Sequence, residues 1–333
     1  MRRVPWFVAL VVAATAFVVI AAGCGSSSNN NSNGSATGSS SKSKKYTIGI
    51  VAFAGADPTS SLAIDGVKNV AKQKGWSVSY IDPNGEADKA VAAMQDLVQK
   101  KVDLMMVTVF PAKALAAGAI AAKAAGIPIV SLSGGLGNGI QTNYDSGIQQ
   151  GQDIAARMVK DMGGKGDLLA LGYKSGLPCI EREAGLDSAL KGTSIKETRD
   201  EVPIPGQVEA GTRFTAAWLA KHPADGQPKA IWACFDDPAL GAISAVQSAG
   251  RKDVKIYGIN GQPAAIKAIE RGQMTATVFL DAYKAGQLVA ENAPRFVAGG
   301  TNAKPQNLPV PSIIVDKDTV KGFLKKYPNA INQ

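Results

Sequence analysis

Short apolar runs alternate with amphipathic segments from Tyr46 to Gln333, and this alternation constrains the fold more than any other feature. Ile48–Val51 has the β-branched enrichment of a strand buried on both faces. The next segment places its apolar residues, from Leu62 to Val70, at helical spacing. Strands that alternate with helices predict parallel sheets with helices on both faces. The expected fold class is α/β, and the number of strands favours two sheets.

The same two patterns predict the later elements. The expected strands are Trp76–Ile81, Asp103–Thr108, Pro128–Leu132, Asp167–Leu171, Ala230–Phe235, Val254–Ile259 and Thr275–Leu280. The expected helices are Glu86–Lys101, Ala112–Ala125, Gln149–Met162, Ile180–Leu190, Gly211–Lys221, Pro238–Ala249, Pro263–Arg271 and Ala282–Ala298. Glycines suited to helix ends recur in both halves, which predicts two halves of similar plan; they are Gly75, Gly126, Gly250 and Gly272.

The loop after the first strand is the first candidate for a binding site. Pro58 cannot donate to a strand ladder, so it ends the strand. Thr59 or Ser60 is expected to cap the helix that follows. Ligands of parallel α/β sheets bind at the carboxyl ends of strands. The ligand contacts of this unit are therefore expected between Phe53 and Ser60.

The N-terminal segment has the pattern of a secretory signal. Met1–Arg3 is charged, Val4–Ala22 is almost wholly apolar, and small residues precede Cys24. The pattern resembles a bacterial lipobox, although Ala21 stands where leucine is usual. This implies removal of residues 1–23 and lipidation of Cys24. The alternative is an uncleaved membrane anchor, because the apolar run is just long enough to span. Either interpretation places the body of the chain outside the cytoplasm.

Residues 24–45 are expected to form a flexible tether, since residues 25–45 contain no apolar side chain larger than alanine. The rest of the chain is long enough for two lobes. The formal net charge of the whole chain is +9, and loss of Arg2 and Arg3 leaves +7. The lysines are scattered singly along helices, without an aromatic-and-basic motif for nucleic acid. We therefore expect a solvated surface and no nucleic-acid partner.

A set of ordered motifs carries a family resemblance that covers Tyr46–Val315. The motifs are YTIGIV, AIDGVKNVAKQKGW, MQDLVQKKVDLMMV, AAKAAGIPIVSLSGG, EREAGL, AIWACFDDPALGAISAVQSAG and VKIYGINGQPAAIKAIERGQMTATV. In this order they resemble the type I periplasmic binding proteins, above all the ribose and simple-sugar solute-binding proteins of ABC importers. The resemblance implies two doubly wound lobes joined by a three-strand hinge, with a ligand enclosed in the cleft when the lobes close.

The implied crossings between the lobes fall near Tyr144–Asp145, Leu280–Asp281 and Pro309–Ser312. The N-terminal lobe would then contain residues 46–144 and 282–310. The C-terminal lobe would contain residues 145–281 and 311–333.

When positions are matched to the resembled family, most of its charged sugar-binding groups are replaced in this sequence. Asp57 stands where the family has an amide or acid, and Thr59 and Ser60 stand where it has stacking aromatics. Ser133–Gly134 replaces an Asp-Arg pair, and Ile180 replaces a second arginine. Phe235 replaces an amide, Asn260 an aspartate and Leu280 a glutamine. Each sugar hydroxyl left unpaired in a closed cleft costs about 1–3 kcal/mol. The matched positions therefore argue against ribose as the ligand and for a more apolar cleft.

The remaining candidate ligand contacts are aromatic and acidic residues. The full predicted set is Phe53, Asp57, Thr59, Ser60, Ser133, Gly134, Tyr144, Tyr173, Phe235, Asp236, Asn260 and Asp281. Phe53 and Tyr173 are equally well explained as packing residues. Asp236 suits the N-cap of a helix that begins at Pro238, and Asn260 precedes a glycine in a turn.

With Cys24 lipidated, Cys179 and Cys234 remain as an even pair in an oxidising compartment. We expect a disulfide between them, with buried free thiols as the alternative. His222 is the only histidine, so no metal site is expected.

The sequence predicts a binding protein rather than an enzyme, because it lacks a nucleophile elbow and a phosphate-binding loop. A regulator of the lactose-repressor family would carry a helix-turn-helix where the signal and tether stand. The expected protein is a monomeric solute-binding lipoprotein on the outer face of the cytoplasmic membrane, which delivers a sugar-like ligand to an ABC permease without a cofactor. The alternatives are a receptor that feeds a membrane sensor, and a binding protein for a nucleoside or aromatic metabolite.

Overall fold

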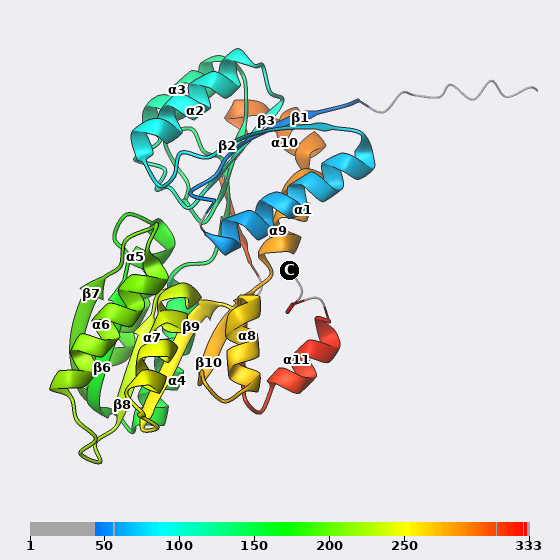
Figure 1. The fold of residues 1–333 in the computed structure, drawn as a ribbon. Coiled ribbons are helices and arrows are strands. Elements are labelled where there is room, and N and C mark those ends of the chain that lie inside the picture. The colour runs from blue at the N-terminus through cyan, green and yellow to red at the C-terminus, as the bar shows by residue number, and fades with distance from the viewer. Residues whose placement is uncertain (1–43, 56, 311, 329, 332–333) are drawn as a thin grey trace, which may run out of the picture. The chain divides into compact units, whose positions relative to one another are not determined.

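The computed structural model describes residues 44–55, 57–310, 312–328 and 330–331 (Figure 1). The predicted signal, the lipidation site at Cys24 and almost all of the predicted tether lie outside the described residues. Lys44–Gln333 forms one compact unit. Its strands form two sheets of six strands, and helices pack on both faces of each sheet. The prediction of an α/β fold with two doubly wound lobes is confirmed.

The first sheet belongs to lobe one, and every strand pair in it is parallel. Its strand order is β11-β5-β4-β3-β1-β2. The strands are β1 (Thr47–Val51), β2 (Ser77–Ile81), β3 (Leu104–Thr108), β4 (Ile129–Leu132), β5 (Thr142–Asp145) and β11 (Gln306–Pro309). The helices packed around it are α1 (Pro58–Lys74), α2 (Ala87–Gln99), α3 (Ala116–Ala124), α9 (Ala282–Glu291) and α10 (Ala293–Gly299), followed by the 3₁₀ turn η1 (Gly300–Asn302).

The second sheet belongs to lobe two and repeats this plan in the order β12-β10-β9-β8-β6-β7. Its last strand, β12, is antiparallel to β10, whereas the other pairs are parallel. The strands are β6 (Lys165–Gly172), β7 (Ser194–Glu201), β8 (Lys229–Ala233), β9 (Val254–Asn260), β10 (Ala276–Leu280) and β12 (Ser312–Asp316). The helices are α4 (Ile148–Met162), α5 (Leu177–Leu190), α6 (Gln207–Lys221), α7 (Asp236–Ser248), α8 (Pro263–Glu270) and α11 (Val320–Lys326).

The chain passes from one sheet to the other three times: between β5 and α4, between β10 and α9, and between β11 and β12. The central strands β3 of lobe one and β8 of lobe two are buried along their whole length, and β1 is buried at every residue after Thr47. This burial explains why their sequences are continuous apolar runs rather than alternating ones. The carboxyl ends of these strands carry the loops that form the site described below.

Two predicted helix boundaries are wrong for local reasons. The N-cap of α1 is Asp57, not Thr59 or Ser60, because its carboxylate accepts hydrogen bonds from the backbone N–H groups of both. Pro58 then occupies the first helical position, where its missing N–H is not needed. The single helix expected over Ala282–Ala298 is two helices, because α9 ends at Glu291 and α10 begins at Ala293, with Pro294 in its first turn.

The elements missed from the sequence are β5, β7, β11, β12 and α11. Strand β7 (SIKETRDE) lies at the edge of its sheet and is rich in charged residues, so no apolar run indicates it. Strand β11 contains Pro309 and is also an edge strand, where proline is tolerated. The predicted helix-end glycines are confirmed in conformation, since Gly75, Gly126, Gly250 and Gly272 all have positive φ.

Candidate functional site

A cavity lies where the carboxyl ends of the strands of the two lobes meet. Three residues that follow β1, β3 and β4 line it from lobe one: Phe53, Val109 and Ser133. Three residues at the ends of β6, β8 and β9 line it from lobe two: Tyr173, Phe235 and Asn260. The crossings contribute Ser146, Leu280 and Val310. The position matches the rule that parallel α/β sheets bind ligands at the carboxyl ends of their strands.

Backbone strain is concentrated around this cavity. Val109, Ser133 and Asn260 have φ of 63°, 62° and 121°, although none of them is glycine. A positive φ is a true outlier for a β-branched residue such as valine. Such conformations persist where surrounding hydrogen bonds hold them, and they cluster at ligand sites. Here the Val109 N–H donates to Leu132 O and the Ser133 N–H to Tyr144 O, both at 2.8 Å.

The walls of the cavity are mainly apolar. Phe53 is buried against Phe110, with ring centroids 4.8 Å apart, and it meets Tyr173 of lobe two edge-on at 5.9 Å. Phe53 is therefore both a core residue and a wall of the cavity, so the two explanations of this residue apply together. Phe235 and Ile204 extend the apolar wall of lobe two.

Asp57 lines the cavity, but its carboxylate is largely engaged within α1. Its Oδ1 accepts from Thr59 N at 3.2 Å, and its Oδ2 accepts from Ser60 N at 3.1 Å and from the Ser60 hydroxyl. Burial raises the pKa of Asp57, against the lowering effect of these hydrogen bonds. This carboxylate consequently has less capacity for a ligand than the sequence alone indicated.

Two polar atoms of the cavity lining are buried and have no hydrogen-bond partner among the described residues. They are Oγ1 of Thr59, from lobe one, and Oδ1 of Asn260, from lobe two. A buried polar group without a partner costs about 1–3 kcal/mol. A ligand hydroxyl or amino group that donates to Asn260 and pairs with Thr59 would satisfy both lobes at once.

Arg182 is a cavity residue that the sequence comparison missed. Its Nε donates to Ser146 O at 3.0 Å, and its Nη1 donates to Cys234 O at 2.7 Å. Its Nη2 lies 3.3 Å from the Ser146 hydroxyl, which lies 2.6 Å from the hydroxyl of Ser133. Burial lowers the pKa of Arg182 to about 10, so the group remains charged at neutral pH.

Ile180, which was matched to a family arginine, does not line the cavity. Ile180 is 43% exposed, whereas Arg182 lines the cavity and is 3% exposed. The conclusion that the cavity lacks such a cation is corrected accordingly. A signal for Arg182 was present, because it lies three residues after Cys179 in the same helix, and such residues share a helix face.

Four predicted site residues do not line this cavity: Gly134, Tyr144, Asp236 and Asp281. A Cβ at Gly134 would stand 2.3 Å from Phe110 O, so this residue serves close packing. Tyr144 is part of the hydrophobic core. The carboxylate of Asp281 accepts from Lys284 N at 2.9 Å and caps α9.

Asp236 neither lines the cavity nor caps its helix. The N-cap of α7 is Phe235, and no side chain makes a capping hydrogen bond there. The carboxylate of Asp236 instead accepts from Thr277 Oγ1 at 2.7 Å and from Gln262 N at 2.8 Å. Asp236 therefore joins the start of α7 to β10 and to the loop that follows β9, directly beside the cavity residues Phe235 and Asn260.

The burial of Asp236 predicts a pH dependence of stability. Burial raises the pKa of its carboxyl group to about 7, whereas the unfolded chain titrates in the ordinary aspartate range. The folded protein thus retains a proton that the unfolded chain has released, and stability falls as the pH rises. Between about pH 5 and pH 8 this group should remove about 2–3 kcal/mol from the free energy of unfolding.

Urea denaturation of the wild type and of Asp236→Asn at both pH values measures this effect. The amide mimics the neutral carboxyl, so the variant should lose less stability than the wild type as the pH rises. Equal losses in the two proteins would show that Asp236 is ionised throughout.

A disulfide joins Cys179 to Cys234 in lobe two, and Cys179 lines the cavity. It links the start of α5 to the end of β8, near the hydrogen bond from Arg182 to Cys234 O. His222 stacks on Trp218 at 4.4 Å. Among the described residues, no group of three side chains suited to a metal ion is present.

Comparison with known proteins places this architecture in a family. A family model described as periplasmic binding protein domain matches residues 48–301. The chain belongs to this family. The ribose import binding protein of Bacillus subtilis is 26% identical over 272 residues, which cover 80% of this chain and 87% of the relative. The xylitol-binding protein of Mycolicibacterium smegmatis is 28% identical, with coverage of 64% and 61%.

Solved structures agree with this assignment. A solute-binding protein of an ABC transporter from Agrobacterium vitis, with bound allitol, is 26% identical with a TM-score of 0.77, and the match covers 85% of this chain and 99% of the other. An ABC sugar transporter subunit from Rhodobacter sphaeroides is 25% identical with a TM-score of 0.75, with coverage of 82% and 98%. The predicted family and the prediction of a solute-binding protein rather than an enzyme are confirmed.

Within the described part of the chain, no helix has the length and apolar character that crossing a membrane requires.

Proposed function

We propose that this protein is the solute-binding subunit of an ABC importer for a sugar or polyol. The observation that carries the proposal is the cavity between the lobes, where Thr59 and Asn260 present unpaired polar atoms from opposite sides. A ligand that pairs with both is bound fully only when the lobes are close together. Relatives and structural neighbours named for ribose, xylitol and allitol support a polyhydroxylated ligand.

The lobes proposed to close are residues 46–144 with 282–310, and residues 145–281 with 311–333. The proposed ligand contacts are Thr59, Asn260, Asp57, Ser60 and Ser133, with walls from Phe53, Tyr173 and Phe235. Apolar walls supply affinity through buried area, and a few polar groups fix the orientation of the ligand. The lining therefore favours a polyol or modified sugar with one apolar face over a simple aldose.

A second candidate is a nucleoside or aromatic metabolite. The edge-on pair of Phe53 and Tyr173 and the wall at Phe235 favour a ligand with a flat face. Such a ligand would place its ring against these side chains and a hydroxyl between Thr59 and Asn260.

Thermal-shift screening of the secreted protein tests both candidates. The panel contains ribose, xylitol, allitol, myo-inositol, a purine nucleoside and an aromatic acid. At least one polyol or sugar should raise the melting temperature, because a ligand bound only by the folded state stabilises it by mass action. A shift with the nucleoside alone would favour the second candidate, and turnover of a covalent bond would contradict both.

We also propose that Cys24 carries a lipid anchor after removal of residues 1–23. Two acyl chains give stable membrane residence, whereas one does not. The variant Cys24→Ala should be released from membranes or remain unprocessed. Mass spectrometry of the membrane fraction measures the modification directly. Normal cleavage together with unchanged membrane retention of the variant would contradict the anchor.

A further inference from the structure

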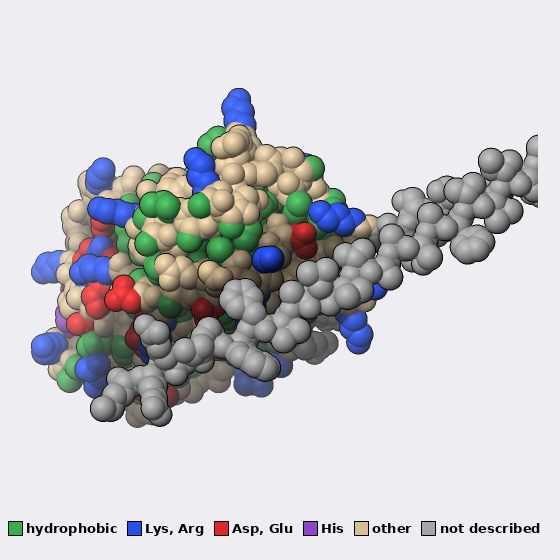
Figure 2. All heavy atoms as spheres, turned by 90° about the horizontal axis from the view of Figure 1, so that it is seen from above, with side chains coloured by type: hydrophobic (Ala, Val, Ile, Leu, Met, Phe, Trp, Pro, Cys, Tyr) green, Lys and Arg blue, Asp and Glu red, His purple; other side chains and the backbone are tan. Residues whose placement is uncertain are grey.

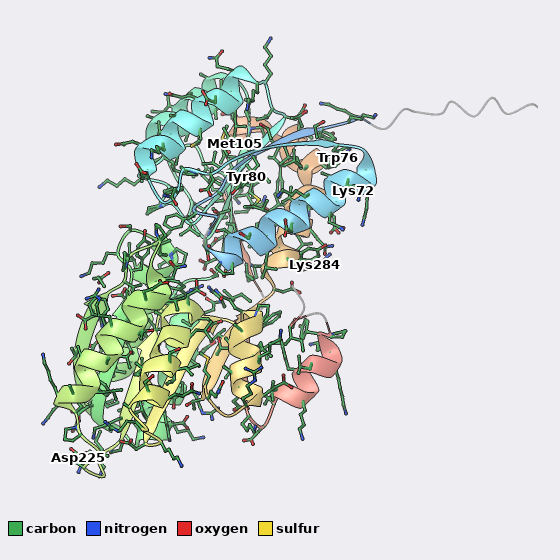
Figure 3. The ribbon with its side chains drawn as sticks, in the orientation of Figure 1. Lys72, Trp76, Tyr80, Met105, Asp225 and Lys284 are labelled. Carbon is green, nitrogen blue, oxygen red and sulfur yellow. A yellow bond between two sulfur atoms is a disulfide. The ribbon has the colours of Figure 1, made fainter. Side chains whose placement is uncertain are left out.

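The two sheets have matching strand orders, which give the cavity a hinge side and a mouth side. The order is β11-β5-β4-β3-β1-β2 in lobe one and β12-β10-β9-β8-β6-β7 in lobe two. All three crossings between the lobes use strands from the first two positions of these orders. One of them leads into α9, whose start is marked by the label of Lys284 in Figure 3. We call the part of the cavity lined by residues that follow the first three strands of each order the hinge side, and the part lined by residues that follow the last three the mouth side.

The strands of the mouth side lead into apolar cavity walls. The cavity residues directly after β1, β3, β6, β7 and β8 are Phe53, Val109, Tyr173, Ile204 and Phe235. Tyr173 is the one member of this set with a polar atom in its side chain. A ligand hydroxyl placed against these walls would lose its hydrogen bonds to water without gaining equivalent ones from the side chains. The part of the ligand that lies here is therefore expected to be apolar.

The lobes touch each other at the mouth side. The ring of Phe53 from lobe one meets the ring of Tyr173 from lobe two edge-on, with 5.9 Å between their centroids. A Cβ added to Gly85 of lobe one would stand 3.5 Å from the carbonyl oxygen of Ile204 of lobe two. An apolar group between these walls is consequently enclosed by both lobes.

The hinge side also has polar side chains. Ser133, Ser146 and Asn260 follow β4, β5 and β9 and line the cavity there. The Oδ1 atom of Asn260 is buried without a hydrogen-bond partner among the described residues. Thr59 begins α1 but borders the same side, because it lines a small groove together with Asn260 and Leu280. Its Oγ1 is the other buried atom of the lining that has no partner in the described structure. Both unpaired polar atoms are thus beside the hinge.

Three further polar residues of the lining are bonded within the protein. The hydroxyl of Ser60 donates to the carboxylate of Asp57, and Arg182 donates to the carbonyl oxygens of Ser146 and Cys234. These bonds leave the contrast between the two sides of the cavity in place. The outer face shown in Figure 2 differs from the mouth side, because lysine and arginine side chains are spread among its apolar ones. An apolar group of a ligand is therefore better accommodated at the mouth side than on that face.

We propose that the ligand is a glycoside, in which a sugar carries an apolar aglycone. The sugar hydroxyls pair with Thr59 and Asn260 on the hinge side, and the aglycone lies against Phe53, Tyr173 and Phe235 on the mouth side. The inference rests on the proposed function and narrows the ligand class of the same site. An aromatic aglycone suits these walls, because aromatic rings pack well in edge-on or offset arrangements. A nucleobase fits less well, since its donors and acceptors would lie against apolar side chains.

Calorimetry with matched pairs of glycosides tests the inference. The probes are the methyl and phenyl β-glycosides of xylose, glucose and galactose, together with benzyl alcohol as a probe without a sugar. For at least one sugar, the phenyl glycoside should bind at least about tenfold more tightly than the methyl glycoside, because the larger aglycone buries more apolar area. Benzyl alcohol should bind at least about tenfold more weakly than that phenyl glycoside, because it lacks the sugar hydroxyls.

Variants on the two sides of the cavity locate the aglycone. Val109→Thr and Ile204→Thr, made separately, each place a hydroxyl on the mouth side and should lower the preference for phenyl over methyl at least about threefold. Thr59→Val, on the hinge side, should weaken binding of both glycosides alike and so keep the preference. Ile120→Thr, at an exposed position of α3, is the matched control and should bind as the wild type does. Melting temperatures confirm that each variant is folded.

Three outcomes would overturn the inference. The first is equal affinity for the methyl and phenyl members of every pair that binds, and the second is benzyl alcohol that binds as tightly as the phenyl glycoside. The third is an unchanged preference in both Val109→Thr and Ile204→Thr, which would place the aglycone elsewhere. Binding of a free sugar or polyol from the thermal-shift panel, with no binding of any glycoside, would overturn this inference alone and leave the proposed function standing.

Discussion

Arg182→Met should lower the free energy of unfolding by about 5 kcal/mol, because the substitution leaves several buried acceptors without a donor. The guanidinium bonds Ser146 O and Cys234 O directly and also contacts the Ser146 hydroxyl. Each buried acceptor without a partner costs about 1–3 kcal/mol, and methionine cannot donate to any of them. Urea denaturation near neutral pH, where the arginine is charged, measures the loss.

The matched control is Arg213→Met, an exposed arginine in α6 of the same lobe. It should change the free energy of unfolding by less than about 0.5 kcal/mol. A small effect of Arg182→Met would mean that water or a neighbouring group replaces the arginine as donor. It would also remove the structural basis for treating Ser133, Ser146 and Arg182 as one hydrogen-bonded group.

Loss of the disulfide is expected to have the second-largest effect. The bridge closes a loop with a sequence separation of 55 residues. The chain-entropy model gives about 4 kcal/mol for a loop of this length. Cys179→Ala/Cys234→Ala should therefore unfold at a markedly lower urea concentration than the wild type, with the transition followed at the same pH.

Intact mass after alkylation without reductant provides the control for this prediction. The folded, secreted wild type should carry no label on Cys179 or Cys234, and reduction should add two labels. Two labels without reduction would contradict the bridge and would assign any stability loss in the double variant to packing instead.

Most of the fold could be predicted because buried strands have an apolar pattern that surface elements lack. Strands β3 and β8 are buried along their length, and their sequences LMMVT and KAIWA are nearly continuous apolar runs. Strand β7 is at a sheet edge and exposes much of its surface, so tertiary position rather than sequence pattern determines its conformation. The start of α1 was predicted wrongly for a different reason. The sequence did carry a local signal there, because an Asp-Pro pair indicates a helix cap more strongly than the hydroxyl residues that follow it.

The candidate site was only partly predictable, because strand ends indicate a location but not the direction of each side chain. Phe53, Phe235 and Asn260 line the cavity as expected from their strands. Asp236 follows Phe235 in the sequence, yet its side chain turns toward β10 and bonds Thr277. Arg182 was missed because only positions matched to the family were considered, and Ile180 stood at the matched position. The place of Arg182 three residues after Cys179, on the same face of α5, was a signal in the sequence.

Calorimetry on Thr59→Val tests the central claim most directly, with the ligand that gives the largest thermal shift. Valine keeps the shape of threonine and removes an unpaired buried hydroxyl, so the unliganded variant should be as stable as the wild type or more stable. Its ligand affinity should fall by about tenfold or more, as should that of Asn260→Ala, because each removes a hydrogen bond to the ligand. Thr198→Val, in exposed β7, is the matched control and should bind as the wild type does. Wild-type affinity in both Thr59→Val and Asn260→Ala would contradict capture of the ligand between the two lobes.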